Sequence, residues 1–207
     1  MVPSSSDRSE TPGLVLRSHT GAAYRFDPGA LSLELLPTGG PGAFRRYEWL
    51  HTPVDLAAWA GRSRLVPTPV LRITEDELTA ARAVRDALWR IVVARTEGTP
   101  GAPDDVRLLN EAAALPPLAP AIGTDGARAW AGPGSGAQLL STVARDAVDL
   151  LTGPHAQRIR TCAAADCQLV YVDASRPGRR RWCSMEHCGN RHKVRTLRAR
   201  RAEEEGS

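Results

Sequence analysis

The sequence predicts an α+β protein, built from a mixed N-terminal domain with a helical bundle and a small C-terminal module. Three observations support this fold class. Apolar residues recur at helical spacing between residues 75 and 152, short apolar stretches alternate with glycine and proline between residues 14 and 36, and all four cysteines lie within residues 162–188. A chain of 207 residues is long enough for one domain with a buried core and an added module.

The first 12 residues are polar and rich in serine, and we expect them to form a disordered lead. They lack the apolar segment of a signal peptide. No stretch of the chain approaches the ~20 apolar residues that a membrane-spanning helix requires. We therefore expect a cytoplasmic protein that does not engage a membrane.

Residues 13–36 contain short apolar stretches interrupted by glycine and proline, a pattern typical of strands and turns. We expect a small β-rich start here. A brief helix is predicted over residues 54–60, because Leu56, Trp59 and Ala60 would then share one side.

The clearest helical signal covers residues 75–95. Thr74 is followed three residues later by Glu77, the spacing of a capping box in which each side chain satisfies a free backbone amide. Apolar residues then keep the spacing of one helix face, namely Leu78, Ala81, Val84, Leu88, Ile91 and Val92. We expect this face to form part of the core.

Two further helices are predicted over residues 104–115 and 138–152. Ser135 is placed to cap the second of them, and a Gly-Pro pair ends it. The stretch between these helices, residues 118–136, has no clear pattern. We place the end of the N-terminal domain at residue 157.

The cysteines follow the pattern C-x4-C-x15-C-x4-C. Two disulfides would not persist in a reducing cytoplasm, whereas two pairs of thiolates can surround one tetrahedral metal ion. We expect the cofactor Zn²⁺, bound by Cys162, Cys167, Cys183 and Cys188 in a closed structural site. His187 is an alternative to Cys188 as a ligand, and redox chemistry or a disulfide is the alternative to a metal.

The residues around the cysteines predict the layout of the module. Residues 168–172 are β-prone, residues 173–178 supply a turn, and residues 189–201 are helix-prone. This order of loop, hairpin, loop and helix, with the last cysteine at the start of the helix, is typical of a treble-clef-like zinc finger.

Charge is concentrated in the same segment. Residues 158–201 hold 12 basic and 3 acidic side chains, a net charge of +9, whereas residues 1–157 sum to −2. A segment of this kind implies a polyanionic partner.

The predicted C-terminal helix arranges part of this charge. Arg191, Arg195 and Arg198 recur at helical spacing and form one basic stripe. We expect Val194 and Leu197 to pack on the hairpin and so to turn the stripe outward.

Guanidinium groups match phosphate oxygens in a bidentate fashion, so we expect this basic surface to contact the phosphates of a nucleic acid. The candidate nucleic-acid contacts are Arg179, Arg180, Arg181, Asn190, Arg191, Lys193, Arg195 and Arg198. RNA or a protein partner would use the same arginines, and a solvated helix face paired with the acidic tail is a further alternative.

Two short motifs add a resemblance to a known family. The segment Arg181-Trp182-Cys183-Ser184-Met185 and the segment Cys188-Gly189-Asn190-Arg191, at this cysteine spacing, resemble the CGNR zinc finger proteins, in which the finger follows an N-terminal ABATE domain. The resemblance implies an ABATE-like domain over residues 13–157, a CGNR zinc finger over residues 158–202 and an acidic tail over residues 203–207. It also implies a stress-related transcription regulator whose finger contacts DNA and whose N-terminal domain senses a ligand or dimerises.

No carboxylate pair, nucleophile with a base, or phosphate-binding loop is visible, so we expect no catalytic residue and no enzyme. His19, His51 and His155 are scattered, and we expect them to be ordinary surface or core residues. Trp49, His51 and Trp59 could line a ligand pocket, although tryptophans more often build a core. The sequence identifies no ligand, and it leaves a homodimer open.

Overall fold

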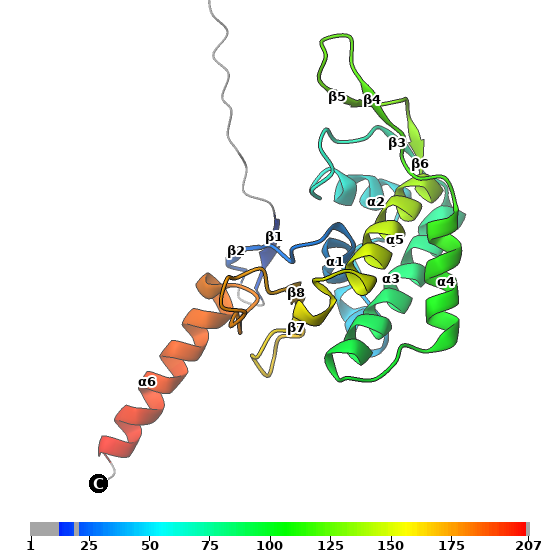
Figure 1. The fold of residues 1–207 in the computed structure, drawn as a ribbon. Helices are drawn as coiled ribbons and strands as arrows, with labels where there is room; N and C mark the ends of the chain where they lie inside the picture. Colours follow the sequence, from blue (N-terminus) through cyan, green and yellow to red (C-terminus); the bar gives the residue numbers. More distant parts are fainter. Residues whose placement is uncertain (1–12, 19–20, 206–207) are drawn as a thin grey trace, which may run out of the picture.

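The computed structural model describes residues 13–18 and 21–205, without the side chains of residues 202, 203 and 205. The predicted lead over residues 1–12, His19 and the last two residues of the acidic tail lie outside the described residues. The α+β fold class is confirmed: a helical body carries small two-stranded sheets, and a small C-terminal module holds the four cysteines (Figure 1). In the part of the chain that is described, no helix is long and apolar enough to cross a membrane.

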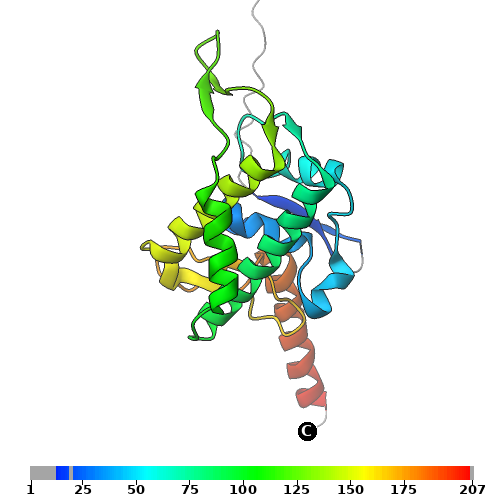
Figure 2. The same cartoon turned by 90° about the vertical axis from the view of Figure 1, so that its right-hand side faces the viewer.

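The helical body contains five helices among the described residues. They are α1 (Leu31–Leu35), α2 (Pro53–Ala60), α3 (Glu75–Thr96), α4 (Pro103–Ala114) and α5 (Gly136–Thr152). Helices α3, α4 and α5 pack against one another, as Figures 1 and 2 show from two sides. The predicted helices over residues 54–60, 75–95, 104–115 and 138–152 are therefore confirmed to within two residues at each end.

The predicted caps are present at the starts of α3 and α5. Thr74 Oγ1 accepts a hydrogen bond from Glu77 N, and Ser135 Oγ accepts one from Gln138 N. The Glu77 carboxylate also serves both helices, because it accepts from Thr74 N (2.9 Å) and from Ala137 N (3.0 Å). Burial alone would raise the pKa of Glu77, but the backbone amides that it binds outweigh burial and hold this pKa below its usual value.

The β-rich start is only partly right. Strands β1 (Leu14–Arg17) and β2 (Ala23–Phe26) form an antiparallel hairpin, but the apolar run that follows is helix α1, and all five of its residues are buried. A short continuous apolar run fits a buried strand or a buried helix equally well. The 3₁₀ turns η1 (Leu36–Thr38) and η2 (Gly42–Tyr47) then lead into α2.

The stretch that had no clear pattern forms short strands. Strands β4 (Pro120–Ile122) and β5 (Arg128–Trp130) make a hairpin that projects from the body, and β6 (Gly134–Ser135) runs parallel to β3 (Leu71–Arg72) (Figures 1 and 2). Trp130 anchors the projecting hairpin by donating a hydrogen bond from Nε1 to the carbonyl oxygen of Pro67.

Trp59 is a core residue of the body. Its side chain is buried, and its Nε1 donates to the carbonyl oxygen of Glu34 (2.9 Å). The Glu34 carboxylate is itself buried and accepts from the Nε of Arg64, whose Nη2 also binds Asp27. This network ties the segment after β2 to the loop after α2.

The C-terminal module begins with η3 (Ala156–Arg158) and an antiparallel pair of strands, β7 (Ile159–Thr161) and β8 (Val170–Val172). The side chains of β8 alternate between two apolar clusters. Val170 and Val172 join the large cluster of the helical body, whereas Tyr171 joins a second one. A π-helical turn, η4 (Met185–Gly189), then leads into α6 (Asn190–Glu205), which extends away from the body (Figure 1).

Candidate metal centre and basic surface

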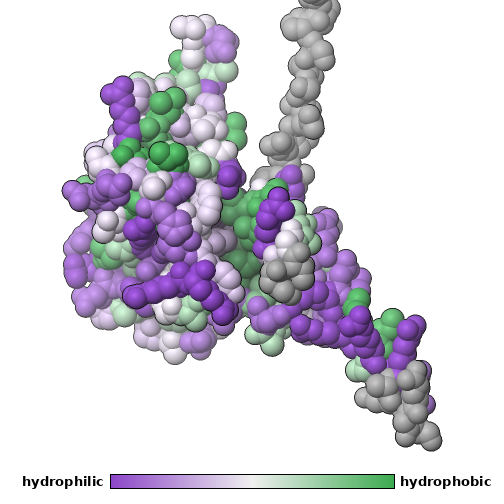
Figure 3. Space-filling model, turned by 180° about the vertical axis from the view of Figure 1, so that it is seen from behind, coloured by the Kyte–Doolittle hydropathy of each residue, from purple (hydrophilic) through white to green (hydrophobic). Residues whose placement is uncertain are grey.

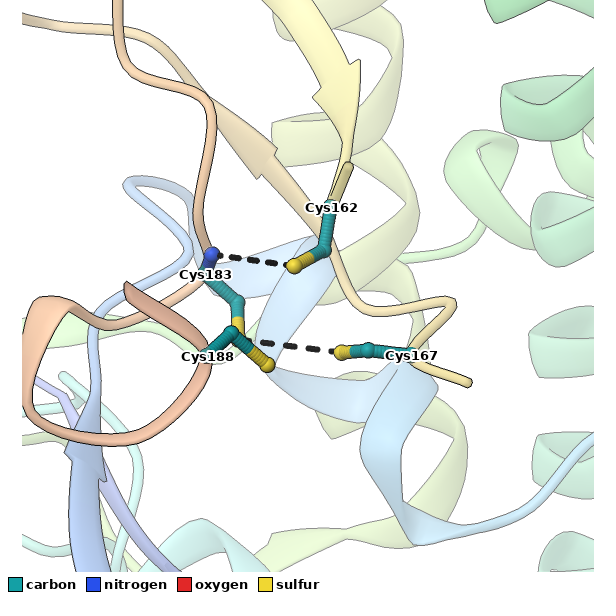
Figure 4. Close-up of side chains that lie close together, drawn as sticks. All are labelled: Cys162, Cys167, Cys183 and Cys188. Carbon is teal, nitrogen blue, oxygen red and sulfur yellow. Dashed lines mark hydrogen bonds between the residues drawn. The ribbon is translucent and has the colours of Figure 1, made fainter. Parts of the chain in front are cut away.

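The four cysteine sulfurs converge on one point. Cys162 and Cys167 lie in the loop between β7 and β8, Cys183 lies just before η4, and Cys188 lies within it (Figure 4). All four sulfurs lie within 4.8 Å of one another. The Cys167–Cys183 and Cys183–Cys188 sulfur separations are 3.7 Å and 3.5 Å. A tetrahedral ion bound at ~2.3 Å would place its sulfur ligands about 3.8 Å apart, so these residues fit Zn²⁺.

Backbone hydrogen bonds shape the two loops that present the sulfurs. In the first loop, Cys162 N donates to Leu169 O and Cys167 N donates to Ala164 O, each at 2.9 Å. The second pair is joined to the first because Cys183 N donates to Cys162 Sγ at 3.4 Å (Figure 4). Within the sulfur cluster, hydrogen bonds from Cys167 and Cys183 lower the pKa of Cys162, whereas the neighbouring sulfurs and burial raise the pKa values of Cys167, Cys183 and Cys188.

The hairpin of the module encloses the first cysteine pair. The sequence suggested a hairpin between the two pairs, but β8 pairs with β7, which precedes Cys162, and the segment after β8 forms no strand. Each strand has only three residues, so the pairing depends on the tertiary contacts of the module.

The second apolar cluster surrounds the sulfurs, and we call it the second core. Its buried members are Phe26, Cys162, Tyr171, Cys183 and Cys188. Gly189 is buried beside it, and a Cβ at this position would lie 2.9 Å from Met185 Sδ. The glycine of the CGNR segment therefore lies against the end of the Met185 side chain.

His187 does not join the sulfurs. Among the described residues, the group that could hold a metal ion consists of the four cysteines alone. The His187 ring stacks instead on Tyr24, with ring centroids 4.2 Å apart and an interplanar angle of 11°. Burial, together with the negative charge of the nearby cysteines, raises the pKa of Tyr24 far above its ordinary value.

Arg180 lies inside the module, although it stands in a row of three arginines. Its guanidinium lies over the Tyr171 ring, 4.0 Å from the centroid. It donates to the carbonyl oxygens of Asp27, Trp182 and Cys183. Arg180 thus holds the segment before η4 in place, while its neighbours Arg179 and Arg181 are exposed.

The first turns of α6 are tied to the loop of the first cysteine pair. Arg191 forms an ion pair with Asp166, and Arg195 Nη2 lies 3.4 Å from the same carboxylate. The other candidate contacts on this helix, Asn190, Lys193 and Arg198, are exposed. The eight candidate nucleic-acid residues therefore fall into three groups. The first consists of five exposed side chains, the second of Arg180, which is hydrogen-bonded within the module, and the third of Arg191 and Arg195, which contact Asp166.

The expected packing of α6 on the hairpin is wrong. Val194 and Leu197 are 47% and 51% exposed. One face of the β7–β8 pair contributes to the core of the body and the other to the second core, so no face remains for them. Figure 3 shows hydrophilic residues over most of the projecting helix, with a few hydrophobic ones among them.

Trp182 is partly buried and packs against the second core. Its ring lies 4.7 Å from that of His192 and beneath the Arg181 guanidinium. Phe26 and Asp166 are among the residues of this site that sequence reasoning missed. Neither stands in a local pattern, because each takes its role from a segment distant in the chain.

Comparison with known families agrees with this arrangement. Residues 29–154 match the ABATE family, described as "putative stress-induced transcription regulator", and residues 158–201 match the CGNR zinc finger. The cofactor is Zn²⁺, for which the finger supplies the four clustered cysteines. No curated protein matches the chain.

Proposed function

The chain belongs to the ABATE family, described as "putative stress-induced transcription regulator", and carries a CGNR zinc finger, and we propose that it regulates transcription by binding DNA through this finger. Zn²⁺ would be held by Cys162, Cys167, Cys183 and Cys188, and its role is to link the two loops into one scaffold. The proposal assigns no catalytic step to the protein.

The observation that carries the proposal is the surplus of exposed cations around the sulfur cluster. Residues 158–201 have a net charge of +9, and a zinc ion with four thiolates contributes about −2. Arg179 and Arg181 are exposed on the segment before the third cysteine, and Lys193 and Arg198 are exposed on α6. These side chains are free to approach phosphates, which dominate the affinity of most DNA-binding proteins.

The module offers few groups for reading bases. Asn190 is exposed at the start of α6, and its Nδ2 donates to Glu186 O at 3.2 Å. Arg195 is exposed and is held at one end by Asp166. We assign phosphate contact to Arg179, Arg181, Lys193 and Arg198, and we leave base contact to Asn190 and Arg195.

We place the N-terminal domain at residues 13–157 and the finger at residues 158–202, and we assign ligand sensing or dimerisation to the first of these. The family description supports a regulator rather than an enzyme. The two parts share the strand pair β7–β8, so a change in the body would reach the finger through a packed contact.

A salt titration of the intact protein tests the proposal. Fluorescence anisotropy with a random DNA duplex should show an affinity that falls steeply with salt and is lost when a chelator removes zinc. Arg179→Ala/Arg181→Ala/Arg198→Ala should lower the salt slope by about 0.9 for each phosphate contact removed.

The matched control carries the same change of charge in the helical body: Arg45→Ala/Arg46→Ala/Arg107→Ala, which replaces three exposed arginines. It should keep the slope of the unmutated protein. A slope near zero in the unmutated protein would reject DNA binding. Stronger competition by structured RNA than by duplex DNA, at one salt concentration, would assign the same surface to RNA.

A further inference from the structure

We infer that the β1–β2 hairpin is a structural part of the zinc finger, and that Phe26 and Tyr24 close the apolar shell around the metal centre. Neither matched family range includes residues 13–28. In Figure 1 the hairpin lies beside the C-terminal module rather than among the helices of the body. The inference concerns how the metal is retained, and it does not depend on DNA binding.

Phe26 is the first support. Its side chain is fully buried and belongs to the second core, together with three of the cysteines and Tyr171. Leu16 and Tyr24 of the same hairpin pack at the margin of this cluster. The module itself contributes Tyr171, Leu169 and Trp182 to this cluster, and the hairpin completes the apolar cover of the sulfurs from the other side of the chain.

The stack of Tyr24 on His187 is the second support. His187 directly precedes Cys188, and its ring lies nearly parallel to the Tyr24 ring at 4.2 Å. Tyr24 therefore covers the turn that presents the last cysteine. Groups that hold or shield ligand residues in this way usually affect metal affinity without binding the metal themselves.

Hydrogen bonds to the carbonyl oxygens at the end of the hairpin are the third support. Val172 N donates to Pro28 O at 2.8 Å, and Arg180 Nη2 donates to Asp27 O at 3.1 Å. Gly29 follows with φ +86°, and a Cβ there would lie 3.1 Å from Val172 Cβ. Only glycine combines this backbone conformation with such a close approach.

The topology gives the physical reason for a mutual dependence. Among the residues that the structure describes, strands β1 and β2 pair only with each other, and an isolated two-stranded hairpin is at best marginally stable in water. The hairpin is therefore ordered by the finger on which it packs. In turn, the finger loses the cover over its sulfurs if the hairpin leaves.

Hydrogen exchange on the intact protein tests this dependence directly. When a chelator removes zinc, amides of residues 14–17 and 23–26 should lose protection together with those of residues 159–190. Amides in α3 and α5 should keep theirs, because these helices pack in the core of the body. A hairpin that stays protected in the metal-free protein would overturn the inference.

Zinc release from hairpin variants gives a second test. We expect Phe26→Ala to release zinc to an excess of chromogenic chelator about tenfold faster than the unmutated protein, and Tyr24→Ala to release it severalfold faster. Tyr24→Phe keeps the aromatic face and should restore the slow rate. Val15→Ala on the same hairpin, where the side chain is 68% exposed, should leave the rate unchanged.

Tyr24→Ala keeps the test decisive if Phe26→Ala fails to fold, because Tyr24 lies at the margin of the second core. Far-ultraviolet circular dichroism of each variant should remain that of the unmutated protein, since the helices lie outside the hairpin. Release rates unchanged in both Tyr24→Ala and a folded Phe26→Ala would overturn the inference. These readouts involve no nucleic acid, so they are independent of the DNA-binding proposal.

Discussion

Asp166, in the loop between the first two cysteines, forms an ion pair with Arg191 at the start of α6. The same carboxylate lies 3.4 Å from Arg195. An exposed ion pair contributes little to stability, so the main effect of Asp166 is on the charge of this surface. It occupies Arg191 and Arg195, and it competes with any phosphate for these two arginines.

Replacement of Asp166 should therefore strengthen nucleic-acid binding. We expect Asp166→Asn to bind random duplex DNA about fivefold more tightly at low salt, the effect of removing ~1 kcal/mol of repulsion between exposed charges. The salt slope should steepen by up to about 0.9 for each arginine released. Anisotropy measures both quantities.

Asp104→Asn is the control, because it removes the negative charge of an exposed side chain on α4, which lies outside the finger. It should bind as the unmutated protein does. An equal increase in DNA affinity in both variants would mean that the overall charge of the protein, and not the contact of Asp166 with the two arginines, sets the affinity.

Arg179 and Arg180 are neighbours in the sequence with different expected roles. Arg180→Ala removes the hydrogen bonds to Trp182, Cys183 and Asp27, so it should release zinc about tenfold faster. Arg179 is exposed, and Arg179→Ala should retain zinc while lowering the salt slope of DNA binding by about 0.9. The zinc release rate and the salt slope of DNA binding are measured for both variants. If the two mutations changed both quantities equally, the division of roles between Arg179 and Arg180 would be wrong.

Glu77 provides a pH-dependent prediction about stability. Its pKa is lowered in the folded protein, so its carboxylate stabilises the fold above the unfolded-state pKa of about 4.3, and this contribution is lost as pH falls through the folded-state pKa. Glu77→Gln should lower the free energy of unfolding at pH 7 by about 1 kcal/mol, the usual value of a helix cap. The difference should shrink toward pH 3.

Urea unfolding at the two pH values measures this effect. Glu75→Gln changes an acidic side chain in the same first turn of α3, where the capping contacts are made by Glu77. Glu75→Gln should lower the free energy of unfolding at pH 7 by less than Glu77→Gln does, and this loss should depend less on pH. An equal loss in the two variants would assign the effect to the helix dipole rather than to the two caps.

The parts of the fold that the sequence predicts are those determined locally. The capping residues Thr74, Glu77 and Ser135 mark helix starts because a cap involves residues within one turn. The cysteine spacing likewise predicts the sulfur cluster, since each pair lies in one short loop. These signals need no knowledge of the tertiary structure.

Other features depend on partners distant in the chain. Helix α1 is buried on every side, so its sequence has no amphipathic pattern that would separate it from a strand. Val194 and Leu197 have apolar spacing but no surface on which to pack. Phe26 packs beside the sulfurs only because its hairpin, more than 130 residues before the first cysteine, folds over the metal centre.

Strand β8 faces two clusters at once, with Val170 and Val172 on one side and Tyr171 on the other. This strand therefore belongs to the cores of both parts of the molecule, and its packing fixes the orientation of one part relative to the other. The helical body and the C-terminal module should therefore share one rotational correlation time in solution. Whatever meets the arginines of the module would meet the helical body at a set orientation.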